Sequence, residues 1–180
     1  MTICTYKDWN GTTLGAGAKL LPWLRDSGSL TQRIMQHCKH FAVHSVRSGM
    51  ARIALDESAT LGIAPQQLAW SREVFLYADD QPVIFAHSAC KELRGAWQIL
   101  RQLGNRPLGA LLFSHPQIIR QPLHYKTLRA HHPLYRRAAS VLSDPPGRLW
   151  ARRSLFYLQG APLLVTEVFL PEILKLRIED

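Results

Sequence analysis

Two segments with the pattern of β-hairpins constrain the fold of this chain more than any other feature. In "WSREVFLYADDQPVIFAHSAC" (70–90) and "LWARRSLFYLQGAPLLVTEVFLP" (149–171), two runs rich in β-branched and aromatic residues flank a short turn. The first turn contains Asp79, Asp80 and Pro82, and the second has a Gln-Gly-Ala-Pro sequence, which are residue types that form tight turns. Because strands joined by a tight turn are antiparallel, these segments predict an antiparallel sheet.

Other stretches predict one more strand and several helices. The alternation in "FAVHSVRSGM" (41–50) is typical of a strand. "LLPWLRDSGSLTQRIMQHC" (20–38) predicts two short helices broken at "DSGS", with Ser29 as the N-cap of the second. "ELRGAWQILRQLG" (92–104) has helical periodicity and ends at Gly104, a typical C-cap. We therefore expect one α+β domain over residues 1–180, with helices on one side of the sheet.

Composition excludes several classes of protein. With 47% hydrophobic and 19% charged residues, the chain is too apolar to be disordered, yet it has no run of about 20 apolar residues that could span a membrane. The N-terminal 15 residues are polar where an export signal would be apolar, so we expect a cytoplasmic protein. Cys4, Cys38 and Cys90 are odd in number and widely spaced, which predicts reduced thiols and no metal site.

The net charge of +9 is compatible with nucleic acid, an anionic membrane or a small anionic substrate as partner. Many of the basic residues lie in or near "RQPLHYKTLRAHHPLYRRAAS" (120–140). A solvated helix with basic residues on its outer face is the ordinary interpretation of such a stretch. We expect no specific nucleic-acid binding, because the surrounding sequence has no helix-turn-helix, RNP-type or zinc-finger motif.

Three separated blocks resemble one enzyme family. "SREVFLYADDQPVIFA" (71–86), "LGNRPLGALLF" (103–113) and the 149–171 segment, in this order and spacing, resemble the chorismate pyruvate-lyases, which supply 4-hydroxybenzoate for ubiquinone. The resemblance runs from about residue 20 to residue 173. It implies a sheet of about six antiparallel strands, helical flaps over a buried ligand, no cofactor, and conversion of chorismate to 4-hydroxybenzoate and pyruvate. We also expect inhibition by the product and a monomeric protein.

The resemblance assigns four residues to the substrate by position. They are Leu30 in a flap, Arg72 in the first hairpin, Leu108 in the Pro-Leu-Gly turn, and Glu167 in the second hairpin. Arg72 suits the ring carboxylate, because a guanidinium forms a bidentate, charge-assisted pair with it. The alternatives are that Arg72 pairs with Glu73 or another acid, and that Glu167 points to solvent from an edge strand.

The Pro-Leu-Gly turn and Glu167 have distinct expected roles. We predict that Pro107 fixes one side of the turn and Gly109 relaxes the other, so that the Leu108 N–H points at a ligand carboxylate. Glu167 would bond the hydroxyl on carbon 4 of chorismate, either to orient the ring or as a base. A concerted hydrogen transfer that needs positioning alone is equally compatible with the sequence.

The chain departs from compact members of the family at two places. Those members have Gly-Arg-Thr where this chain has Ala-His-Ser (86–88), so His87 is an additional candidate for the substrate's second carboxylate, as a cation or a neutral donor. The segment 115–148 is longer here, and would either cover the site or decorate the surface. A domain of this fold that senses a small acid without catalysis is the alternative function.

Overall fold

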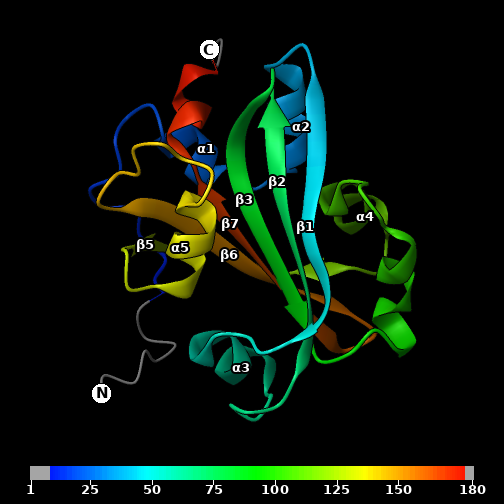
Figure 1. Cartoon of the computed structure of the whole chain (residues 1–180). Coiled ribbons are helices and arrows are strands. Elements are labelled where there is room, and N and C mark those ends of the chain that lie inside the picture. The colour runs from blue at the N-terminus through cyan, green and yellow to red at the C-terminus, as the bar shows by residue number, and fades with distance from the viewer. Residues whose placement is uncertain (1–8, 177–180) are drawn as a thin grey trace.

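The computed structural model describes residues 9–176, which form one antiparallel sheet covered by short helices (Figure 1). Cys4 and most of the segment considered for an export signal lie outside these residues. The strand order is β1-β2-β3-β7-β6-β4, and β5 also pairs with β6. The strands are β1 (Phe41–Ala51), β2 (Ala69–Ala78), β3 (Gln81–Cys90), β4 (Ile119–Arg120), β5 (His124–Leu128), β6 (Leu149–Leu158) and β7 (Ala161–Phe169). The predicted α+β class is confirmed, and the sheet of about six strands has seven, one of them only two residues long.

Both predicted hairpins are confirmed. Asp79 and Asp80 connect β2 to β3 with φ angles of 47° and 64°, and Gln159 and Gly160 connect β6 to β7 with φ angles of 51° and 78°. Positive φ at both central residues matches the twist of the flanking strands, which is why Asp and Gly occur there. The two hairpins meet along β3 and β7 and form the centre of the sheet.

Helices cover both faces of the sheet, whereas the sequence led us to expect them on one. One face carries α1 (Leu21–Arg25), α2 (Leu30–Gln36), the 3-10 helices η2 (Gly95–Gln102) and η3 (Pro171–Lys175), and α4 (Leu108–Ser114). The other carries α3 (Leu55–Leu61) and α5 (Pro133–Ala139). The reason lies in the central strands: nine of the ten residues of β2 are buried, so both of its faces need a cover.

Local signals at the helix ends are also confirmed. The Ser29 side chain accepts a hydrogen bond from the Gln32 N–H at 3.3 Å and caps α2, as predicted. The helix expected over 92–104 is the 3-10 helix η2, and Gly104 follows it with a φ of 53°.

Residues 9–176 include no helix long and apolar enough to span a bilayer.

The segment 115–148 is part of the fold and is not a single solvated helix. It supplies β4 and β5, which extend the sheet beside β6, and α5, which packs on the opposite face from α2 and α4. Within α5, Leu134, Tyr135 and Ala138 are buried and Arg136 is exposed. The outer face of this helix is therefore basic, as expected, while its inner face contributes to the core.

The core on the α2 side consists of two hydrophobic clusters with a cavity between them. One cluster joins α1 and α2 to the ends of β2 and β3 around Trp23 and Leu76. The other joins η2 and α4 to the opposite ends of the strands around Trp97 and Phe156. Residues of both clusters line the cavity, so the packing that stabilises the fold also forms its walls.

Candidate active site

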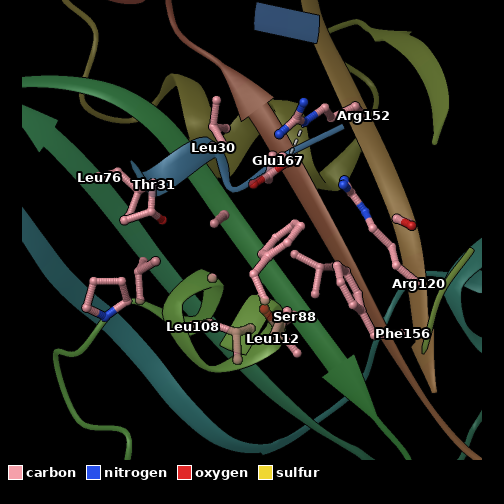
Figure 2. A pocket seen from close by; sticks show the side chains of 18 of the residues that line it. Leu30, Thr31, Leu76, Ser88, Leu108, Leu112, Arg120, Arg152, Phe156 and Glu167 are labelled. Atoms are coloured by element: carbon pink, nitrogen blue, oxygen red, sulfur yellow. Dashed lines mark hydrogen bonds and ion pairs between the residues drawn. The ribbon is translucent and has the colours of Figure 1, made fainter. Parts of the chain in front are cut away.

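The cavity lies between the sheet and the helices α2 and α4 (Figure 2). Its walls are mostly apolar and include Val43, Val74, Leu76, Leu112, Phe156 and Val165. Four charged residues line it as well: Arg72, Arg120, Arg152 and Glu167. Three guanidinium groups and one carboxylate give the lining a formal net charge of +2. Such a cavity suits a small ligand that is both partly apolar and anionic.

Four of the five residues predicted from the sequence line this cavity. Leu30 begins α2, Leu108 begins α4, and Arg72 and Glu167 point into the cavity from β2 and β7. His87 does not line it. Ala86 and Ser88, its neighbours in β3, do, and successive side chains of a strand point to opposite faces. His87 therefore lies on the other side of the sheet.

The strand register fixes the spacing between Arg72 and Glu167. Arg72 lies opposite Ser88 of β3, whereas Ala86, two residues earlier, lies opposite Glu167 of β7. The Cα atoms of Arg72 and Glu167 are thus two strand spacings and two residues apart, roughly 12 Å. Both side chains project from the same face of the sheet into the cavity, so they can contact opposite ends of one small ligand.

Arg72 is buried and bonded only to main-chain atoms. Its Nη2 donates to the carbonyl oxygens of Gly104 at 2.8 Å and Arg106 at 3.1 Å. Within residues 9–176 it has no ion pair, and Glu73, its neighbour in β2, instead contacts His87 and Arg137 on the opposite face. Burial lowers the pKa of Arg72, although a guanidinium remains protonated. The site thus contains a buried cation that has no counter-ion in the described part of the chain and has donors left for a ligand.

Glu167 is held by an arginine that sequence reasoning missed. Arg152 Nε donates to Glu167 Oε2 at 2.6 Å. Its Nη1 donates to the carbonyl oxygens of Trp23, Leu24 and Asp26, which would otherwise lack partners at the end of α1. Glu167 therefore does not point to solvent, and β7 is not an edge strand.

The sequence did contain a signal for Arg152. A two-residue turn at Gln159 and Gly160 pairs Leu158 with Ala161, and the same register, counted back along both strands, places Arg152 opposite Glu167.

Arg120 is a second cavity residue without a clear sequence signal. It belongs to the two-residue strand β4 and lies opposite Phe156 of β6. Its Nη1 donates to the Ser27 carbonyl, and its guanidinium carbon lies 5.2 Å and 5.4 Å from the ring centroids of Phe113 and Phe156. Figure 2 shows Arg120, Arg152 and Glu167 together beside β6 and β7. This end of the cavity is therefore rich in charge.

The Pro-Leu-Gly segment has a different geometry from the predicted one. Pro107 is the N-cap of α4 and Leu108 its first residue, so the Leu108 N–H has no carbonyl partner within the helix. Gly109 does not have a positive φ. A Cβ added there would lie 3.1 Å from Ser29 Oγ and 3.2 Å from Thr31 Oγ1. The glycine thus allows α4 to approach α2 closely; it does not relax a turn.

His87 is part of a buried ionic network on the opposite face. Its Nδ1 lies 3.2 Å from Glu73 Oε1 and its Nε2 lies 3.2 Å from Glu57 Oε1 in α3. Burial acts to lower the pKa of His87, but the two carboxylates outweigh it and raise the pKa to about 9. Burial likewise acts to raise the pKa of Glu57, but His87 and the Ala54 N–H hold it at about 2. His87 therefore helps to attach α3 to the sheet and does not contribute to the cavity.

The family model described as chorismate lyase matches residues 11–177. The chain belongs to the chorismate lyase family. The residues matched by the family model include all four charged residues that line the cavity.

Curated proteins of the chorismate lyase family are similar over nearly the whole chain. A probable chorismate pyruvate-lyase of Nitrosospira multiformis is 46% identical and covers 98% of this chain and 99% of that protein. Proteins of the same name from Nitrosomonas europaea and Aromatoleum aromaticum are 46% and 48% identical, covering 93% and 88% of this chain and 96% and 88% of theirs.

Solved structures share the chorismate lyase fold at much lower sequence identity. The C-terminal domain of the histidine utilization repressor from Pseudomonas syringae has a TM-score of 0.57 at 10% identity, covering 78% of this chain and 97% of that one. The effector domain of PhnF from Mycobacterium smegmatis has a TM-score of 0.56 at 16% identity, covering 81% and 90%. At these identities the likeness concerns the fold alone.

Proposed function

We infer that this protein is a chorismate pyruvate-lyase, which converts chorismate to 4-hydroxybenzoate and pyruvate. The observation that carries this function is the presence of Arg72 and Glu167, from different strands, in one mostly apolar cavity whose lining has a net charge of +2. Chorismate is a dianion with a six-membered ring, a carboxylate at one end and a hydroxyl at the other. Family membership and the names of close relatives support the same reaction.

Arg72 and Leu108 are proposed to bind the ring carboxylate. The Nη2 of Arg72 is engaged by two carbonyls, which leaves its Nη1 and Nε donors for the ligand. The N–H of Leu108, at the start of α4, supplies another donor. Leu30 covers the apolar part of the ring from α2. A buried carboxylate held by a guanidinium and a backbone N–H is strongly oriented.

Glu167 is proposed to accept a hydrogen bond from the hydroxyl on carbon 4. Arg152 occupies Oε2, so Oε1 is the oxygen that meets the ligand. In the reaction the ether bond at carbon 3 breaks, carbon 4 loses its hydrogen, and the methylene carbon of the enolpyruvyl group gains one to become the methyl of pyruvate. Because the ring becomes aromatic, orientation in a closed cavity accounts for much of the enzyme's task. We favour an orienting role for Glu167 over that of a base.

We propose that the reaction needs no metal or other cofactor, because hydrogen and electrons balance between substrate and products. Purified protein incubated with chorismate and EDTA should release 4-hydroxybenzoate and pyruvate in equal amounts, measured by chromatography and a coupled pyruvate assay. Loss of turnover with EDTA, restored by a divalent ion, would contradict cofactor independence.

Millimolar 4-hydroxybenzoate should lower the initial rate of chorismate turnover, since the product keeps the carboxylate that Arg72 is proposed to bind.

A sensing domain is the second candidate, because the fold is shared with the C-terminal domain of a bacterial repressor and with the effector domain of PhnF. Such a domain would bind a small acid and release no pyruvate, so the same incubation separates the two functions.

We propose further that the enzyme acts as a monomer in the cytoplasm. Sedimentation of the purified protein and fractionation of cells would test these two statements.

A further inference from the structure

Arg120 lines the cavity but has no part in the proposed binding of the ring carboxylate or of the hydroxyl. Arg72 is assigned to the ring carboxylate, while Arg152 is engaged by Glu167 and three backbone carbonyls. Chorismate, however, has a second carboxylate on its enolpyruvyl group. The cavity must therefore hold a second negative charge, and Arg120 is the lining arginine that has neither an assigned ligand group nor an ion pair among residues 9–176.

The contacts of Arg120 point to a missing anionic partner. Its Nη1 donates to the Ser27 carbonyl, but its Nε is buried and has no hydrogen-bond partner among residues 9–176. A buried donor without an acceptor is unfavourable, and a charged acceptor on a ligand would satisfy it. The rings of Phe113 and Phe156 lie against the guanidinium and confine it at the cavity wall.

The position of Arg120 agrees with the chemistry of the substrate. In chorismate the ether carbon is next to the carbon that bears the hydroxyl, so a hydroxyl at Glu167 places the enolpyruvyl group at the same end of the cavity. Figure 2 shows the Arg120 side chain reaching toward Arg152 and Glu167. Resting on the proposed function, we propose that Arg120 binds the enolpyruvyl carboxylate of chorismate and is the residue that distinguishes substrate from product.

The sequence suggested His87 for the second carboxylate, and the structure favours Arg120 instead. His87 cannot reach it, because it lies on the other face of the sheet between Glu57 and Glu73. Arg120 is joined to Ser27, which precedes the α2 helix that closes the cavity. A carboxylate bound to Arg120 would therefore be linked through Ser27 to the segment that leads into α2, and its departure as pyruvate would remove that contact while 4-hydroxybenzoate is still held by Arg72.

The test compares substrate turnover with product affinity in Arg120→Met, which keeps length and removes charge. We expect kcat/KM for chorismate to fall about 10²-fold, as expected for loss of a hydrogen-bonded charge pair, while the Kd of 4-hydroxybenzoate from calorimetry changes less than about threefold. Arg120→Lys should lie between Met and wild type. Arg52→Met, an exposed change between β1 and α3, is the matched control and should behave as wild type.

Each outcome of this experiment decides the proposal. Equal losses in turnover and product affinity would mean that Arg120 supports the whole cavity, and an unchanged kcat/KM would place the second carboxylate elsewhere; either result overturns the proposal. If Arg120→Met did not fold by circular dichroism, the same comparison with Arg120→Lys would decide. An inactive wild-type protein would instead contradict the lyase function itself, so the two failures are distinguishable.

Discussion

Arg72 has no counter-ion among residues 9–176, and its guanidinium is buried against the carbonyls of Gly104 and Arg106. A ligand carboxylate would therefore complete a buried ion pair. Removing one partner of such a pair costs on the order of 3–5 kcal/mol, because the other charge is left buried and alone.

We predict that Arg72→Ala lowers kcat/KM by roughly 10²–10³ and weakens 4-hydroxybenzoate to a similar degree, because substrate and product share the ring carboxylate. Steady-state kinetics and calorimetry would measure the two effects. Arg101→Ala, an exposed change on the neighbouring η2, is the control. Tight product binding by Arg72→Ala would mean that the ring lies in the opposite orientation.

Glu167 allows the two mechanisms to be separated. If it only orients the hydroxyl, Glu167→Ala should cost about 1–2 kcal/mol, the value of one hydrogen bond, and Glu167→Gln should recover much of it. We expect this outcome. A base would instead show a loss of about 10²–10⁴ in kcat with both variants. The fold should survive, since Arg152 keeps its three bonds to α1, and single-turnover kinetics would isolate the chemical step.

At the scale of elements, α3 is attached to the sheet by the ion pair between Glu57 and His87. The pKa of His87 is raised to about 9, so its stabilising contribution is complete below its unfolded value near 6.5 and is lost as pH rises toward 9. The pKa of Glu57 is lowered to about 2, so its contribution is present above about 4.5 and is lost as pH falls toward 2. The two contributions are both complete between about pH 4.5 and 6.5.

We therefore predict that the free energy of unfolding falls by on the order of 1–3 kcal/mol between pH 6.5 and 9. In His87→Gln this part of the pH dependence should largely disappear, although the variant should be less stable at pH 6. Urea unfolding at several pH values would measure both. His131→Gln, at an exposed histidine, should keep the slope of the wild type. The same slope in His87→Gln would mean that other groups cause it.

The elements that the sequence predicted correctly are those set by local chemistry. The Asp79–Asp80 and Gln159–Gly160 turns require positive φ, and Ser29 caps α2, so each signal lies within a few residues. The Arg152–Glu167 pair also follows from the register of the second hairpin, because the turn sets which residues of β6 and β7 lie opposite each other. Long-range packing was not predictable in this way. Arg120 enters the cavity from a two-residue strand, and the need for Gly109 arises from contact with Ser29 and Thr31, distant in sequence.

At the scale of the whole molecule, the positive charge has two separate locations. Inside the cavity, three arginines face one glutamate and are shielded from salt by burial. Outside, exposed basic residues such as Arg129, Arg136 and Arg148 contribute to the net charge of +9. In the proposed function the first location binds the dianion directly, whereas the second can only attract it from a distance.

This difference predicts how the protein responds to salt. The kcat of the enzyme should change little between about 0.02 and 0.5 M salt, because buried contacts are poorly screened, while kcat/KM should fall a few-fold as the long-range attraction of chorismate weakens. Replacing Arg129, Arg136 and Arg148 together with Gln should flatten the salt dependence of kcat/KM and leave kcat unchanged. DNA binding, measured by fluorescence anisotropy, should be weak and should vanish by about 0.2 M salt, as nonspecific phosphate contacts do. Sequence-specific DNA binding that survives such salt would contradict this account, because it would require base contacts from a surface that here serves only to attract a small anion.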